Sequence, residues 1–187
     1  LQVSRKELFT GEDADKWIEA DTLERTQLVA LKCWRPLEDD DLTDSLEIIP
    51  SCVIYTRKRC GKYKARLIAL GNIQKRVQKA AIFSPTVSHA ATRTLLIRGA
   101  RKGQLLGQFD ISNAFIQSSL DKSDQVILRL PKAWSKDPKG DKVLLLRSLY
   151  DLKIAPRKWS DCYKDHLLKT GWEMSPFEPG VFRRGST

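Results

Sequence analysis

The middle of this chain lacks acidic side chains. Between Glu47 and Asp110 the sequence runs for 62 residues with thirteen lysines or arginines and no aspartate or glutamate. The 47 residues before this stretch carry a net charge of −7, and the 78 residues from position 110 onward carry +4. Charge that is so one-sided favours a polyanionic partner, although a solvated basic face without any partner has the same composition.

Other absences exclude whole classes of protein. No apolar run approaches the roughly 20 residues of a transmembrane helix, and the charged first twenty residues do not resemble a signal peptide. The four cysteines form no Cys-x-x-Cys pair and only two histidines are present, which disfavours a zinc site and favours a reduced, intracellular compartment, cytoplasmic or nuclear. The chain begins at Leu1 rather than Met, as expected for a piece of a longer protein.

Hydrophobic periodicity predicts an α+β protein. Helices are expected at residues 15–31, 88–101 and 156–170, and strands at 48–55, 63–70, 105–110, 126–130 and 143–146. In the middle helix, Leu95, Leu96 and Ala100 are expected to form the buried face. Helices and strands alternate irregularly and with hairpins, which favours a mostly antiparallel sheet.

The first two strands predict a hairpin with a cationic tip. Lys64 and Arg66 share one face of the second strand by the period-2 rule, and Ala65, Leu67 and Ala69 share the other. The hairpin therefore offers basic side chains on one surface and apolar ones to a core.

Asp110 is the first carboxylate after the basic stretch. In basic surroundings it would stay ionised and could ligate Mg²⁺, although an aspartate at a strand end is more often a turn or cap residue. Asn113, Ala114 and Phe115 follow with the spacing of a tight turn, whose N–H groups could face phosphate oxygens. Phe115 could pack under a sugar ring, or it could be a core aromatic.

Five longer motifs occur in order along the chain. They are Trp17-x-x-Ala20-x-x-x-Glu24-x-x-x-Leu28, Tyr63-Lys64-Ala65-Arg66-Leu67-Ile68-Ala69-x-Gly71, Phe83-Ser84-Pro85-Thr86-Val87-Ser88, Phe109-Asp110-Ile111-x-x-Ala114-Phe115 and Ser148-Leu149-Tyr150-x-Leu152-Lys153-x-Ala155-Pro156-Arg157-x-Trp159. Together they resemble the reverse transcriptase (RNA-dependent DNA polymerase) domain of copia-type long-terminal-repeat retrotransposons, nearly from end to end.

The resemblance implies a right-hand polymerase fold, with a fingers-like region at residues 1–109 and a partial palm-like region at 110–187. Asp110 matches the first metal-binding aspartate, which implies Mg²⁺ as cofactor. Lys64 and Arg66 match basic residues of the fingers, Arg66 toward the triphosphate of a dNTP, and Phe115 matches the aromatic sugar gate. Asn113 and Ala114 complete the expected nucleotide site.

An RNA–DNA primer–template is the expected macromolecular partner. The residues expected to contact it are Arg57, Lys58, Arg59, Lys62, Lys75, Arg76, Lys79 and Arg157. Polymerase domains of this type can also dimerise, so a homodimer or contacts with other parts of a polyprotein are further expected partners.

The sequence also departs from the family pattern. The Tyr-x-Asp-Asp hairpin does not occur in these 187 residues, Ile154 stands where the family has Gln, and Asp151 stands where it has Gly. The isolated chain is therefore expected to be inactive as a polymerase. Two alternatives remain open, a domesticated non-catalytic nucleic-acid-binding protein and a protein-interaction module that uses the acidic N-terminal segment.

Overall fold

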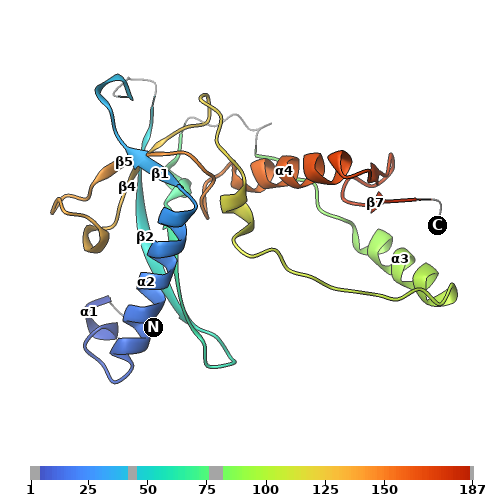
Figure 1. Cartoon of the computed structure of the whole chain (residues 1–187), viewed down its shortest axis with the longest axis horizontal. Coiled ribbons are helices and arrows are strands. Elements are labelled where there is room, and N and C mark those ends of the chain that lie inside the picture. Colours follow the sequence, from blue (N-terminus) through green and yellow to red (C-terminus); the bar gives the residue numbers. More distant parts are fainter. Residues whose placement is uncertain (1–4, 42–45, 76–81, 186–187) are drawn as a thin grey trace.

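The computed structural model describes residues 5–41, 46–75 and 82–185 (Figure 1). The first helices and short turns of helix within them are α1 (Arg5–Leu8), α2 (Ala14–Ala30), η1 (Asp39–Asp41), η2 (Gly71–Ile73) and α3 (His89–Arg101). The later ones are η4 (Ala114–Gln117), η5 (Lys132–Trp134) and α4 (Ala155–Lys169).

A five-stranded sheet organises the molecule. Its strands are β1 (Trp34–Pro36), β2 (Ile48–Arg57), β3 (Tyr63–Ala69), β4 (Ile127–Arg129) and β5 (Lys142–Leu145), in the spatial order β1-β5-β4-β2-β3. Every pairing is antiparallel except that of β2 with β4, which confirms an α+β fold with a mostly antiparallel sheet. A separate two-stranded ribbon joins β6 (Glu173–Met174) to β7 (Phe182–Arg183).

The predicted hairpin is confirmed. β2 and β3 pair from Ser51↔Ala69 to Arg57↔Tyr63, and Gly61 takes a φ of 82° in the turn between them. Ala65, Leu67 and Ala69 are fully buried on one face, as the period-2 rule requires.

Helix α2 lies along this hairpin and covers its apolar face (Figure 1). Its buried residues recur at helical spacing and include Trp17, Ala20, Glu24 and Leu28. Leu23, equally compatible with that spacing, is 52% exposed, so the buried position belongs to the charged Glu24 instead.

Helix α4 begins with Pro156 in its first turn and ends before Gly171, whose φ is 82°, as predicted. Trp159 and Tyr163 stack on its surface with ring centroids 5.7 Å apart. The core itself lies between α2, the sheet and the segment before α4, and its fully buried side chains include Leu28, Leu67, Leu128, Leu145 and Leu149.

Two predictions about the middle of the chain are wrong. Residues 105–110 form no strand but an extended, exposed segment, because no other described strand lies beside it to accept its hydrogen bonds. Helix α3 forms where predicted, with Ser88 as N-cap accepting from Ala91 N–H at 3.2 Å, but Leu95 and Leu96 are 46% and 48% exposed. Figure 1 shows the reason for this exposure, since α3 lies apart from the sheet.

Candidate functional site

A cavity of about 440 Å³ opens between α2, β3 and the turn after Asp110. It brings together all six residues that the sequence predicts for metal and nucleotide binding, namely Lys64, Arg66, Asp110, Asn113, Ala114 and Phe115. A neighbouring hollow of about 360 Å³ shares part of the same wall through Lys58, Lys64, Arg66, Phe115 and Tyr150.

One wall of the cavity is cationic. Lys64 and Arg66 project from the same face of β3, and neither forms an ion pair with any residue that the structure describes. Desolvation lowers the pKa of Lys64, and the positive charges of Arg66 and Lys58 lower it further. An anion placed in the cavity would relieve this mutual repulsion.

Tyr150 positions the arginine of that wall. The guanidinium carbon of Arg66 lies 4.3 Å from the centre of the Tyr150 ring, within the range of a cation–π contact. Phe115 packs edge-on against the same ring, with centroids 5.6 Å apart, and also rests on the core. Phe115 is therefore both a core aromatic and a cavity residue.

The turn after Asp110 is held by a polar chain. Asn113 adopts the left-handed conformation at φ 54° and ψ 38°, which asparagine tolerates better than most residues. Its Oδ1 accepts from the hydroxyl of Tyr150 at 3.4 Å, and its Nδ2 donates to Oε1 of Gln27 at 3.4 Å. Gln27 on α2, the turn and Tyr150 are thus joined around the cavity.

Glu24 is a carboxylate in the cavity wall that sequence reasoning did not select. It is only 6% exposed, and its Oε1 accepts from the N–H of Leu67 at 3.1 Å. Burial raises its pKa, against the opposing effects of this hydrogen bond and of Lys64 and Arg66. A charged residue within the apolar stripe of α2 was the signal that could have identified it.

Asp110 supplies an exposed carboxylate at the mouth of the cavity. No group of three or more histidine, cysteine, aspartate or glutamate side chains among the described residues could hold a metal ion alone. Mg²⁺ commonly uses only one or two carboxylates and completes its coordination with water and substrate phosphate. Asp110 fits that limited role and does not by itself form a protein cage.

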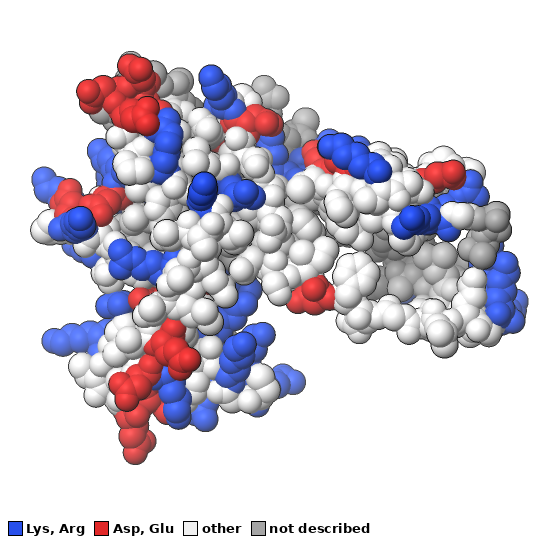
Figure 2. Space-filling model, in the orientation of Figure 1, with Lys and Arg blue, Asp and Glu red and all other residues white. Residues whose placement is uncertain are grey.

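The remaining predicted residues lie outside the cavity or at its edge. Lys58 and Lys62 line it from the hairpin tip. Figure 2 shows basic side chains on both sides of a run of acidic ones in the lower part of the molecule. Lys75 is exposed beyond η2, and its backbone N–H donates to Oε1 of Glu47 at 2.8 Å. Arg57 lies over the ring of Tyr63, at 5.3 Å from its centroid.

Arg157 contacts both its own helix and the segment before α3. Its Nε donates to Asp161 at 2.7 Å, and its Nη1 reaches the carbonyl of Phe83 at 3.5 Å. Arg59 lies in the exposed tip, whereas Arg76 and Lys79 lie outside the described residues.

The two departures near residue 150 have different structural meanings. Asp151 has a φ of 66°, the region that favours glycine, and it stands where the family motif has Gly. Ile154, in place of the family Gln, is 4% exposed and belongs to the core cluster, so its side chain does not line the cavity.

Many carboxylates of the acidic N-terminal segment have partners within the chain. Asp21 is 7% exposed and accepts from Tyr55, Trp134 and Arg5. Asp41 pairs with Arg35 at 2.6 Å. These bonds account for part of the acidic charge and reduce what the segment can offer to a basic partner.

Comparison with known proteins identifies the family. A family model described as "Reverse transcriptase (RNA-dependent DNA polymerase)" matches residues 40–187. The chain belongs to the reverse transcriptase family. This membership confirms the resemblance that the five sequence motifs predicted.

The reverse transcriptase chain is similar to retrotransposon polyproteins of Saccharomyces cerevisiae. The Transposon Ty1-LR2 and Transposon Ty1-ML2 Gag-Pol polyproteins are each 32% identical to it in an alignment of 163 residues that covers 84% of this chain. The matched part is 9% of each polyprotein. No solved structure matches the chain, and none of the described helices is long and apolar enough to span a membrane.

Proposed function

We propose that the cavity binds a deoxynucleoside triphosphate with Mg²⁺, within the fingers and the first part of the palm of a right-hand polymerase. Residues 1–109 would be fingers-like and 110–187 palm-like. One observation carries the proposal: Lys64 and Arg66, which pair with no described carboxylate, line the same cavity as the exposed carboxylate of Asp110. Cations suit the triphosphate, and a carboxylate oxygen suits a hard metal ion held against it.

Each wall has a distinct role in this proposal. Arg66, held over Tyr150, presents its planar guanidinium to phosphate oxygens, while Lys64 acts as a point charge. The backbone N–H groups at Asn113 and Ala114 face the phosphates, and the ring of Phe115 lies under the sugar. Bound Mg²⁺ would neutralise phosphate charge in the cavity.

The proposal extends to nucleic acid at the hairpin tip. Arg57, Lys58, Arg59 and Lys62 carry four positive charges in a row of six residues, and their contacts with an RNA–DNA primer–template would be to its phosphates. Lys75, Arg76, Lys79 and Arg157 are proposed in the same role. Phosphate contacts make the affinity fall steeply with salt, with little dependence on base sequence.

Binding of dTTP in the presence of Mg²⁺, measured by isothermal titration calorimetry, tests the site. Arg66→Ala should weaken binding by roughly 10- to 100-fold, because a charge-assisted hydrogen bond contributes about 1.5–3 kcal/mol and 1.4 kcal/mol is tenfold. Arg101→Ala, which removes an exposed arginine at the end of α3 that does not line the cavity, is the matched control. Equal affinity of both variants, or no binding by the wild type, would refute a triphosphate site here.

Primer extension provides a second test. Among the described residues, Asp110 supplies the one exposed carboxylate that lines the cavity, whereas a site for two metal ions needs several oxygen ligands. We therefore propose that the 187-residue chain binds its ligands but does not extend a primer. Extension by the purified chain that is lost in Asp110→Asn would show that the chain needs no further carboxylates.

A further inference from the structure

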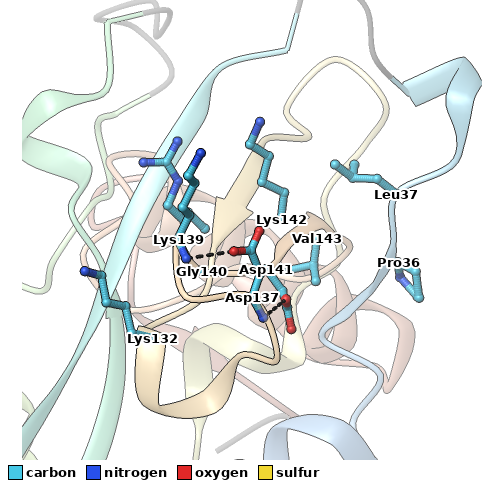
Figure 3. A pocket seen from close by; sticks show the side chains of 10 residues that line it. Pro36, Leu37, Lys132, Asp137, Lys139, Gly140, Asp141, Lys142 and Val143 are labelled. Carbon is cyan, nitrogen blue, oxygen red and sulfur yellow. Dashed lines mark hydrogen bonds between the residues drawn. The ribbon is translucent and has the colours of Figure 1, made fainter.

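A second basic surface lies on the β4–β5 side of the sheet, away from the proposed nucleotide cavity. It is a shallow basin of about 870 Å³ (Figure 3). Its lining contains four exposed cations, Arg129, Lys132, Lys139 and Lys142, and two carboxylates. Among the residues that the structure describes, none lines both this basin and the cavity described above.

The carboxylates of the basin are committed to the backbone of their own loop. Asp141 accepts from the N–H groups of Lys136 and Asp137, each at 3.0 Å, and Asp137 accepts from the N–H of Lys139 at 2.8 Å. These bonds lower the pKa of Asp141 and fix the loop that carries Lys139. Figure 3 shows the bonds donated by the N–H groups of Asp137 and Lys139, and the lysine side chains spreading away from them.

The four cations, in contrast, form no ion pair with any residue in the described part of the chain. Glu38 and Asp41, which follow the basin residue Leu37 in the chain, form ion pairs with Arg35 and not with the cations of the basin. The positive charge of the basin is therefore available to an external anion.

Two of these cations are placed against one another by the sheet. Arg129 and Lys142 are direct cross-strand partners of β4 and β5, and like charges at such a position destabilise a sheet. Gly140 adds to the crowding: its φ is 92°, and a Cβ built on it would meet the carbonyl of Leu130 at 2.6 Å and Cγ of Arg129 at 3.0 Å. The backbone of the turn that follows Lys139 is thus packed directly against β4 at Arg129.

We propose that this basin is a second nucleic-acid contact, which binds the phosphodiester backbone of a strand. No aromatic side chain is among the described residues that line it, so it has no platform for bases and its contacts would be independent of sequence. Phosphate oxygens would supply the negative charge that balances Arg129 and Lys142 on the paired strands β4 and β5. The inference rests on the proposed function in one respect, namely that a polynucleotide is the partner of this chain.

A fluorescence-anisotropy titration of a labelled single-stranded oligonucleotide over a salt series tests this contact. If Arg129 and Lys142 each neutralise one phosphate, Arg129→Ala/Lys142→Ala should reduce the slope of log K against log salt by about 1.4, which corresponds to an affinity about 25-fold weaker at 0.1 M salt. The control, Lys122→Ala/Lys169→Ala, removes the same charge from two exposed lysines elsewhere and should change affinity by less than about threefold.

Further arms separate the possible outcomes. Lys142→Arg keeps the charge and should bind the oligonucleotide as the wild type does. The urea midpoint of the Arg129→Ala/Lys142→Ala variant should equal or exceed that of the wild type, because the repulsion between the two side chains is removed. Wild-type binding that survives the double substitution would overturn the basin and leave the hairpin tip as the contact. No wild-type binding at low salt would overturn the basin and the nucleic-acid part of the proposed function, which dTTP titration then tests separately. Equal competition by polyglutamate would overturn the basin as a nucleic-acid contact and identify an acidic protein as the partner instead.

Discussion

Replacing Gly71 by alanine should damage both the fold and the cavity. A Cβ at this position would lie 1.9 Å from the carbonyl oxygen of Asp151 and 3.2 Å from Cα of Leu152, so backbone rather than a flexible side chain would have to move. The segment that must move also carries Tyr150, whose carbonyl accepts from the N–H of Ala69 at 3.0 Å. The substitution therefore separates β3 from the loop that positions Arg66.

The size of the effect follows from these contacts. Overpacking a close-packed site costs about 1–3 kcal/mol, and weakening one backbone hydrogen bond costs about 1 kcal/mol more. A destabilisation of about 3 kcal/mol lowers the melting temperature of a chain of this size by roughly 6–12 °C. Triphosphate affinity should fall as well, because the ring of Tyr150 would leave its place beneath the guanidinium of Arg66.

Urea unfolding followed by tryptophan fluorescence measures this destabilisation, and Gly107→Ala is the matched control. Gly107 is exposed, has no positive φ, and an added Cβ would meet nothing within 4 Å. The control should be as stable as the wild type or more stable by up to about 1 kcal/mol, since alanine restricts the unfolded chain. A Gly71→Ala variant within about 0.5 kcal/mol of wild type would show that the close approach to Asp151 is not rigid.

Three further predictions concern single side chains. Burial raises the pKa of Glu24 above its ordinary 4.5, so the wild type should lose stability relative to Glu24→Gln as pH rises from about 4 through that raised pKa. Urea midpoints of the two proteins measured across pH test this, and a difference between the midpoints that does not change with pH would contradict it. Iodoacetamide should alkylate exposed Cys60 in the folded protein and spare Cys33, whose burial raises its pKa to about 12, and mass spectrometry of peptides reports which thiol reacted. Trp134→Phe removes the 2.9 Å hydrogen bond to Asp21 and should cost about 2 kcal/mol in thermal unfolding, whereas an unchanged midpoint would mean that Asp21 is satisfied by its other partners.

The periodicity of apolar residues along the sequence predicted the elements that pack against one another. The alternation in β3 correctly assigned Lys64 and Arg66 to one face, because a half-buried strand repeats every two residues whatever its partners. The same reasoning failed for α3, where Leu95 and Leu96 share a face that no described element covers. Periodicity tells which residues share a face, but only tertiary structure decides whether that face is buried.

The cavity was predictable only in part for a similar reason. Asp110 and Phe115 are close in sequence, and motif order linked them to β3. Gln27, Glu24 and Tyr150 enter the site from α2 and from the segment before α4, far away along the chain. The charge of Glu24 within the apolar stripe of α2 is a local signal, but the contacts of Gln27 and Tyr150 depend on how the helix lies on the hairpin, which no local pattern contains.

The position of β3 at the end of the sheet has a consequence for self-assembly. An outer strand normally presents free N–H groups on which a second chain can add a strand and begin aggregation. In this protein two of those N–H groups are already occupied, that of Leu67 by the carboxylate of Glu24 and that of Ala69 by the carbonyl of Tyr150. The contacts that shape the cavity therefore also block the addition of a strand from a second chain. Glu24→Ala should increase aggregation as well as disturb the site.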